Sequence, residues 1–137
     1  MAFAALAISP ANAAGPGVTI AKPWMRFIIP ARPAAGYFTL KNETKEAKVL
    51  IGASSPACGM VMLHKSMTEE GSSQMADVGD VTVAPHKSLV FAPGGYHLMC
   101  MSPASDMGNR KSVPMTLRFK DGSSVSADFT VRGAAGK

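Results

Sequence analysis

The chain has 137 residues, a length that predicts one domain with a single hydrophobic core. Its hydrophobic content of 47% and charged content of 17% are typical of globular proteins and argue against disorder. The net charge of +5 is the excess of 14 Lys and Arg residues, which are scattered along the chain, over 9 Asp and Glu residues. Because they form no dense basic stripe with interleaved aromatic residues, nucleic-acid binding is disfavoured. A modest preference for acidic partner surfaces fits this charge better.

Residues 1–14 resemble the end of a secretory signal peptide. An apolar stretch is followed by the small-x-small pattern Ala11-Asn12-Ala13. No later segment reaches the roughly 18 apolar residues that a membrane span needs. We therefore expect an exported, soluble domain over residues 15–131, followed by a short tail over 132–137.

From residue 18 onward the sequence alternates short runs of strand-forming residues with Gly, Pro, Asn and Ser. No window of a dozen residues shows the 3.6-residue apolar period of an amphipathic helix. These features predict an all-β fold, a single antiparallel β-sandwich of roughly a hundred residues. The expected strands are Val18–Ala21, Trp24–Ile28, Gly36–Lys41, Lys48–Ser54, Met60–His64, Val81–Val83, Ser88–Phe91, Tyr96–Met101, Val113–Phe119 and Ser124–Val131.

Strand alternation places histidine and methionine together. In the strand from Tyr96 to Met101, His97 and Met99 share one face while Leu98 and Cys100 share the other. His64 ends another predicted strand. Met75 follows in the polar segment Lys65–Val78, which we expect to be a mobile loop.

Together, His64, Met75, His97 and Met99 form a donor set suited to Cu(I). Thioether sulfur is a soft, neutral ligand that disfavours hard cations, and imidazole adds donors without charge. Neither ligand forms a disulfide, which suits an oxidising compartment. Methionines often fill cores, and we interpret Met60, Met62 and Met101 as rim or core residues. Met67 is a possible spare donor, and His86 reads as a solvated turn residue.

The same residues closely resemble the periplasmic copper chaperone family PCuAC. Their spacing matches the family motif His-x10-Met-x21-His-x-Met, and the resemblance extends over about Val18–Val131. It is most specific in the segment from Pro93 to Met99. The resemblance implies a cupredoxin-like sandwich, one Cu(I) per chain bound by His64, Met75, His97 and Met99, and metal transfer rather than catalysis.

The family resemblance also implies a periplasmic location and a copper-accepting partner. That partner would be the cytochrome oxidase subunit that carries the CuA centre, or another copper carrier. We expect a monomer. Some family members bind Cu(II) through a His/Met-rich tail, but residues 132–137 contain neither residue type. A second site in the tail is therefore not expected.

The two cysteines, Cys58 and Cys100, leave two alternatives open. They could form a disulfide in an oxidising compartment, or both could be buried as free thiols. Strand alternation places Cys100 on the face opposite His97 and Met99, which argues against a role as ligand.

Other functions fit the sequence less well. A blue-copper electron carrier needs two His, one Cys and a weak axial Met, but no His follows Cys100. An enzyme is disfavoured because no phosphate loop, paired-carboxylate motif or nucleophile arrangement is present. A general periplasmic copper-storage or resistance protein, and a structural sandwich without metal, remain alternatives.

Overall fold

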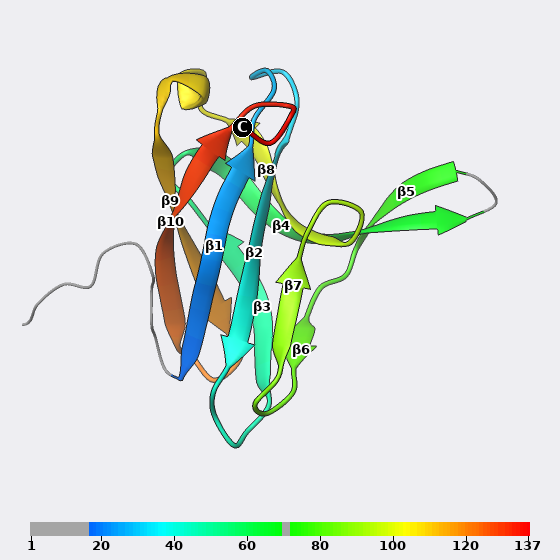
Figure 1. Cartoon of the computed structure of the whole chain (residues 1–137), viewed down its shortest axis with the longest axis vertical. Helices are drawn as coiled ribbons and strands as arrows, with labels where there is room; N and C mark the ends of the chain where they lie inside the picture. Colours follow the sequence, from blue (N-terminus) through cyan, green and yellow to red (C-terminus); the bar gives the residue numbers. More distant parts are fainter. Residues whose placement is uncertain (1–16, 70–71) are drawn as a thin grey trace, which may run out of the picture.

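The computed structural model describes residues 17–69 and 72–137, with the backbone alone for 67–69 and 72–77 (Figure 1). The signal-like segment over 1–14 lies outside the described residues. The described part contains ten strands and one 3₁₀ turn, η1 (Met107–Asn109). The strands are β1 (Val18–Arg26), β2 (Ala34–Asn42), β3 (Lys48–Ser54), β4 (Cys58–Glu69), β5 (Ser72–Asp77), β6 (Val81–Val83), β7 (Ser88–Phe91), β8 (Tyr96–Pro103), β9 (Ser112–Phe119) and β10 (Ser124–Arg132).

The strands form one sheet that closes into a barrel. Their order is β5-β4-β8-β7-β2-β1-β10-β9-β3-β6, and β3 also pairs with β4 through Ala53 and Val61. Closure leaves β6 beside β3, while β5 and the end of β4 project from the barrel as an arm (Figure 1). The prediction of an all-β, single-domain fold is confirmed. Within residues 17–69 and 72–137, no helix has the length and apolarity needed to cross a bilayer.

Two pairs of neighbouring strands depart from the predicted antiparallel arrangement. β1 and β10 run parallel, with Trp24 opposite Thr130, and β7 meets β8 in parallel at Phe91 and Tyr96. β1 and β10 come from opposite ends of the described chain, so no hairpin sets their relative direction. Local sequence patterns therefore cannot reveal this pairing.

Most predicted strands appear with small changes at their ends, and two predictions needed larger correction. The two predicted strands from Val18 to Ile28 form one strand, β1, with an irregular register between Ala21 and Trp24. The expected loop over Lys65–Val78 instead contains a hairpin, because β4 runs on to Glu69 and pairs with β5 over six residue pairs. That polar segment lacks apolar alternation, so backbone pairing with β4 was not visible in the sequence.

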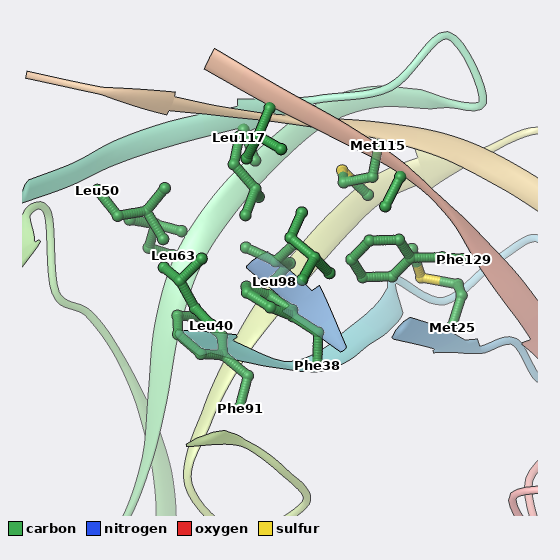
Figure 2. Packing of buried hydrophobic residues seen from close by; sticks show 14 of the residues in the cluster. Met25, Phe38, Leu40, Leu50, Leu63, Phe91, Leu98, Met115, Leu117 and Phe129 are labelled. Atoms are coloured by element: carbon green, nitrogen blue, oxygen red, sulfur yellow. The ribbon is translucent and has the colours of Figure 1, made fainter. Parts of the chain in front are cut away.

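The core fills the inside of the barrel. Figure 2 shows Leu63 and Leu98 pointing inward among Phe38, Phe91 and Phe129, all of which are buried. Gly36 leaves room for this packing, since an added Cβ would lie 3.2 Å from the Cβ of Leu98. Each inward Leu comes just before or after a functional candidate in sequence. The core thereby fixes the two strands that carry the candidates.

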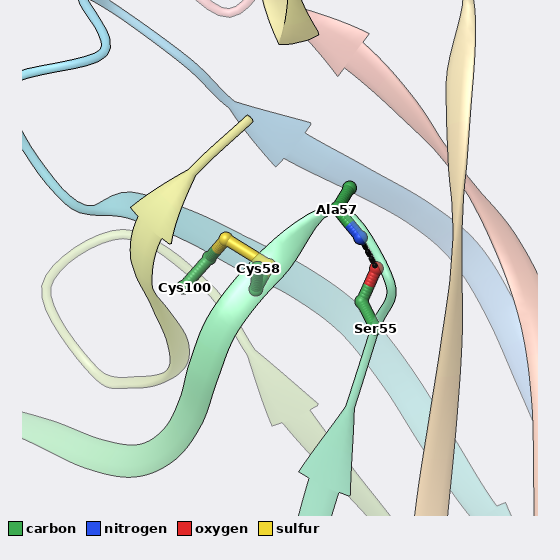
Figure 3. Close-up of a disulfide and its surroundings, with 4 residues drawn as sticks. All are labelled: Ser55, Ala57, Cys58 and Cys100. Atoms are coloured by element: carbon green, nitrogen blue, oxygen red, sulfur yellow. Dashed lines mark hydrogen bonds between the residues drawn. A yellow bond between two sulfur atoms is a disulfide. The ribbon is translucent and has the colours of Figure 1, made fainter. Parts of the chain in front are cut away.

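A disulfide between Cys58 and Cys100 links β4 to β8 (Figure 3). Their Cα atoms lie 5.4 Å apart, and the side chains lie against the core. Just before β4, the Ala57 N–H donates to Ser55 Oγ at 3.1 Å, closing the turn that follows β3. Of the two alternatives for the cysteines, the structure contains the disulfide.

Candidate metal centre

Three of the four candidate ligands lie where β4 pairs with β8. His64 stands directly opposite His97 in the antiparallel ladder, and Met62 stands opposite Met99. The imidazole ring centroids of His64 and His97 are 5.7 Å apart, with an interplanar angle of 71°. Directly opposite residues point to the same face of a sheet. The side chains of His64, His97, Met62 and Met99 therefore share one face, as alternation predicted for His97 and Met99.

This face is the outer side of the barrel wall, but its two β8 residues are shielded from solvent. His97 is 2% exposed and Met99 8% exposed. Neither belongs to the core cluster, which takes Leu63, Leu98 and Cys100 from the opposite face of the same two strands. The centre is thus a covered site outside the core, and methionine packing in the core does not explain Met99.

Three imidazole nitrogens at this site lack hydrogen-bond partners in the described part of the chain. Nδ1 and Nε2 of His64 and Nε2 of His97 are buried, with no hydrogen-bond partner among the described residues. Buried polar atoms are normally hydrogen-bonded, so such atoms call for an explanation. A metal ion would supply a partner for one nitrogen of each ring, because a neutral imidazole carries one lone pair that can bind a metal. The residues present therefore fit a metal site.

The surroundings of His97 favour this neutral form. Burial lowers the pKa of His97, nearby His64 lowers it further, and the Gly95 carbonyl acts in the opposite direction. The His97 Nδ1 lies 3.2 Å from the Gly95 carbonyl oxygen, which can only accept, so Nδ1 carries the proton. The lone pair then resides on the unpartnered Nε2. This arrangement orients a metal-binding nitrogen.

The fourth candidate, Met75, is described by its backbone only. Met75 lies on β5 opposite Ser66, and Asp77 on the same strand pairs with His64. Met67 pairs with Gln74 on this hairpin. The structure thus brings His64, His97 and Met99 together and puts the Met75 backbone on the adjacent strand. The positions of the Met67 and Met75 side chains lie outside its description.

Sequence reasoning missed an aromatic and cationic border to the site. The ring centroids of Tyr37 and His97 are 6.4 Å apart, and those of Trp24 and Tyr37 are 4.8 Å apart. The guanidinium carbons of Arg26 and Arg132 lie 5.3 and 5.2 Å from the Trp24 ring centroid. The strand order β1-β2-β8 creates this row, and no local pattern could have placed these residues beside the candidate ligands.

Other expectations for metal-binding groups can be compared with the structure. Among the described residues, no three His, Cys, Asp or Glu side chains cluster as a metal site. Cys58 and Cys100 are joined to each other, so neither offers a free thiolate. His86 is exposed in a turn, as predicted. The donors gathered at β4 and β8 are thus imidazole and thioether groups.

Comparison with known families identifies the kind of protein. Residues 18–131 match the family described as putative lipoprotein LpqE-like. The chain belongs to the LpqE-like family. A putative lipoprotein of Leifsonia xyli subsp. xyli is 29% identical over 133 residues, covering 93% of this chain and 80% of that protein. An uncharacterized protein of Rickettsia prowazekii is 28% identical over 82% of this chain, which spans 63% of that protein.

Solved structures share the fold of this LpqE-like protein. The copper-bound PCuAC domain of PmoF2 has a TM-score of 0.72 and 22% identity, covering 89% of this chain and 97% of that chain. At that identity the likeness establishes the fold. The solution structure of apo-DR1885 from Deinococcus radiodurans has a TM-score of 0.65 and 27% identity, covering 100% of this chain and 93% of that chain. The resemblance to PCuAC proteins drawn from the sequence is thereby confirmed.

Proposed function

We propose that this LpqE-like protein binds Cu(I) and carries it to another protein. One ion would be held by His64, His97 and Met99, with Met75 as the fourth ligand. The observation that carries the proposal is the set of three unpartnered, buried imidazole nitrogens on the sheet face that also holds Met99. Imidazole and thioether together prefer a soft, monovalent ion and disfavour Mg²⁺ and Ca²⁺. The Cu(I)-bound structure of DR1885, at 27% identity, supports the choice of metal.

Transport of copper accounts for the donor set better than electron transfer does. A blue-copper centre requires a Cys thiolate, and Cys100 is bonded to Cys58 on the core side of β8. A site without thiolate binds Cu(I) less tightly than an all-Cys site would, which favours release to a recipient. We also infer that the barrel is cupredoxin-like and that the protein acts by binding rather than by catalysis.

We further propose an exported, periplasmic protein that acts as a monomer. In this proposal residues 1–14 form a leader and 15–131 the copper-binding domain. The recipient would be the CuA-bearing subunit of cytochrome oxidase or another copper carrier. Arg26 and Arg132 border the site beside Trp24, and neither forms an ion pair within the described part of the chain. Two unpaired cations at this border suit an acidic recipient surface.

A Cu(I) competition titration tests the site. A chromophoric chelator would compete for Cu(I), without oxygen, against the wild type and against each of three variants: His64→Ala, Met75→Leu and Met99→Leu. We expect His64→Ala to lose at least about 100-fold in affinity, since even residues that only orient metal ligands contribute roughly 10–100-fold. His86→Ala removes an exposed imidazole and should leave the affinity unchanged. Equal affinity in the wild type and all variants would refute the proposal.

A transfer experiment separates a carrier from a storage protein. The Cu(I)-loaded protein would be mixed with an apo CuA domain, and copper would be measured in each protein after separation. A carrier gives up its copper to the acceptor, whereas a storage protein retains it. X-ray absorption of the protein loaded with one equivalent of Cu(I) would count sulfur and nitrogen donors, with the proposed set giving two of each.

A further inference from the structure

The row of metal-binding residues on β4 and β8 continues beyond the proposed copper site. After His64 opposite His97 and Met62 opposite Met99, the next pair on the same face is Met60 opposite Met101. Four of the ten methionines in the chain thus occupy two successive cross-strand pairs. Met60 and Met101 are not part of the motif that defines the first site.

These methionines differ from those in the core. Met25, Met107 and Met115 are fully buried, as expected of gap-filling side chains. Met60 is 59% exposed, and Met62 and Met101 are half-buried. One exposed apolar residue is ordinary on a protein surface. Here, however, Met101 lies opposite the exposed Met60, and Met62 is the next residue on the same face of β4. Core packing accounts for none of these three methionines.

The strand geometry allows the three thioethers to converge. Directly opposite residues have Cβ atoms about 4.5–5.5 Å apart, and long side chains also bridge the diagonal. Met60 is opposite Met101, and Met62 is diagonal to Met101 on the same face. Methionine has three rotatable side-chain bonds, so its sulfur adapts to an ion without movement of the backbone.

We propose that Met60, Met62 and Met101 form a second soft-metal site, which binds Cu(I) or Ag(I) through three thioether sulfurs. The donors are soft, neutral thioethers, so the site disfavours hard cations. With thioethers alone, it binds more weakly than the imidazole-containing site beside it. Binding here does not depend on the histidines. A role for this second site as the place where copper enters or leaves the protein would rest on the proposed function, but the binding itself does not.

Silver titration tests the second site because Ag(I) is a soft ion that does not change oxidation state under the assay conditions. Native mass spectrometry of the full chain would count bound ions. We expect two for the wild type and one for Met60→Leu/Met101→Leu. The double variant His64→Ala/His97→Ala should also bind one. Val90→Leu changes another exposed apolar residue, which is 57% exposed, and should still bind two.

A second measurement locates the ion. In the His64→Ala/His97→Ala variant with ¹³C-methyl methionine, Ag(I) should shift the Met60, Met62 and Met101 methyl signals and leave Met115 in place. A single ion in the wild type, or unshifted Met60 and Met101 signals in this variant, would overturn the inference. Loss of binding only in the histidine variant would refute the second site while leaving the proposed function intact.

Discussion

His64 and His97 are direct cross-strand partners, and their imidazole rings meet edge to face at 5.7 Å between centroids. Strand register creates this contact between residues that are distant in sequence. A register shift of one residue would move one histidine to the opposite face and separate the pair. The geometry of the candidate centre therefore depends on whatever holds β4 and β8 in alignment.

Removing the disulfide should reduce stability substantially. Cys58 and Cys100 are separated by 42 positions in sequence, and loop-closure entropy for a loop of that size predicts a loss of about 4 kcal/mol. Urea denaturation of Cys58→Ala/Cys100→Ala against the wild type measures this loss. Intact mass with and without reductant verifies that the wild type contains the bond. A stability change below about 0.5 kcal/mol would contradict the prediction.

The stability of the metal-free protein should fall as the solution becomes acidic. Because burial lowers the pKa of His97 in the folded state, the unfolded chain binds a proton below about pH 6.5 that the folded chain resists. The free energy of unfolding is then highest above that pH and decreases below it, by at most about 1.4 kcal/mol per pH unit for this group. Urea titrations from pH 8 to 5 should show a smaller decrease for His97→Gln. His86→Gln should follow the wild type, and identical slopes in all three proteins would argue against the prediction.

Truncating the core residue behind the site should destabilise the fold. Leu98 is fully buried between His97 and Met99 in sequence, so Leu98→Ala should cost roughly 2–5 kcal/mol. Leu98→Met keeps the volume and should cost less than about 1.5 kcal/mol. Val90→Ala, on an exposed side chain, should stay within about 0.5 kcal/mol. Chemical denaturation of the three variants gives these values, and equal losses for the Ala and Met variants at 98 would be inconsistent with tight packing.

Metal binding should be visible in the fluorescence of Trp24. This is the only tryptophan in the chain, and Tyr37 connects its ring to that of His97. A metal on His97 would restrain this row of rings and alter the emission intensity. Ag(I) titration of the wild type should therefore change the emission, and His97→Gln should abolish the tight phase of that change. An unaltered response in His97→Gln would place the metal elsewhere.

The sequence predicted what depends on local patterning. Composition and turn residues located most strands. Alternation placed His97 and Met99 on one face of their strand and Leu98 on the other. The polar segment around Met75 lacks such alternation, so the β5 hairpin was missed. Its pairing with β4 comes from backbone hydrogen bonds, which any side-chain pattern allows.

Relationships between strands required the structure. The pairing of His64 with His97 depends on β4 lying beside β8, and the contact of Tyr37 with His97 depends on β2 lying on the other side of β8. Strand order and register result from the packing of the whole barrel. Sequence spacing suggested that His64 and His97 act together, but it could not supply their separation or show that three of their four nitrogens lack hydrogen-bond partners among the described residues.

Strand β8 separates two kinds of sulfur by the thickness of one sheet. Cys100 faces inward in a disulfide and is 0% exposed, while Met99 and Met101 face the other way. A thiol-bearing recipient that approached the methionine face could remove a copper ion without reaching the disulfide. Burial would thus keep a recipient's thiol away from the Cys100 sulfur during copper transfer, which favours binding of the metal by that thiol over exchange at Cys100.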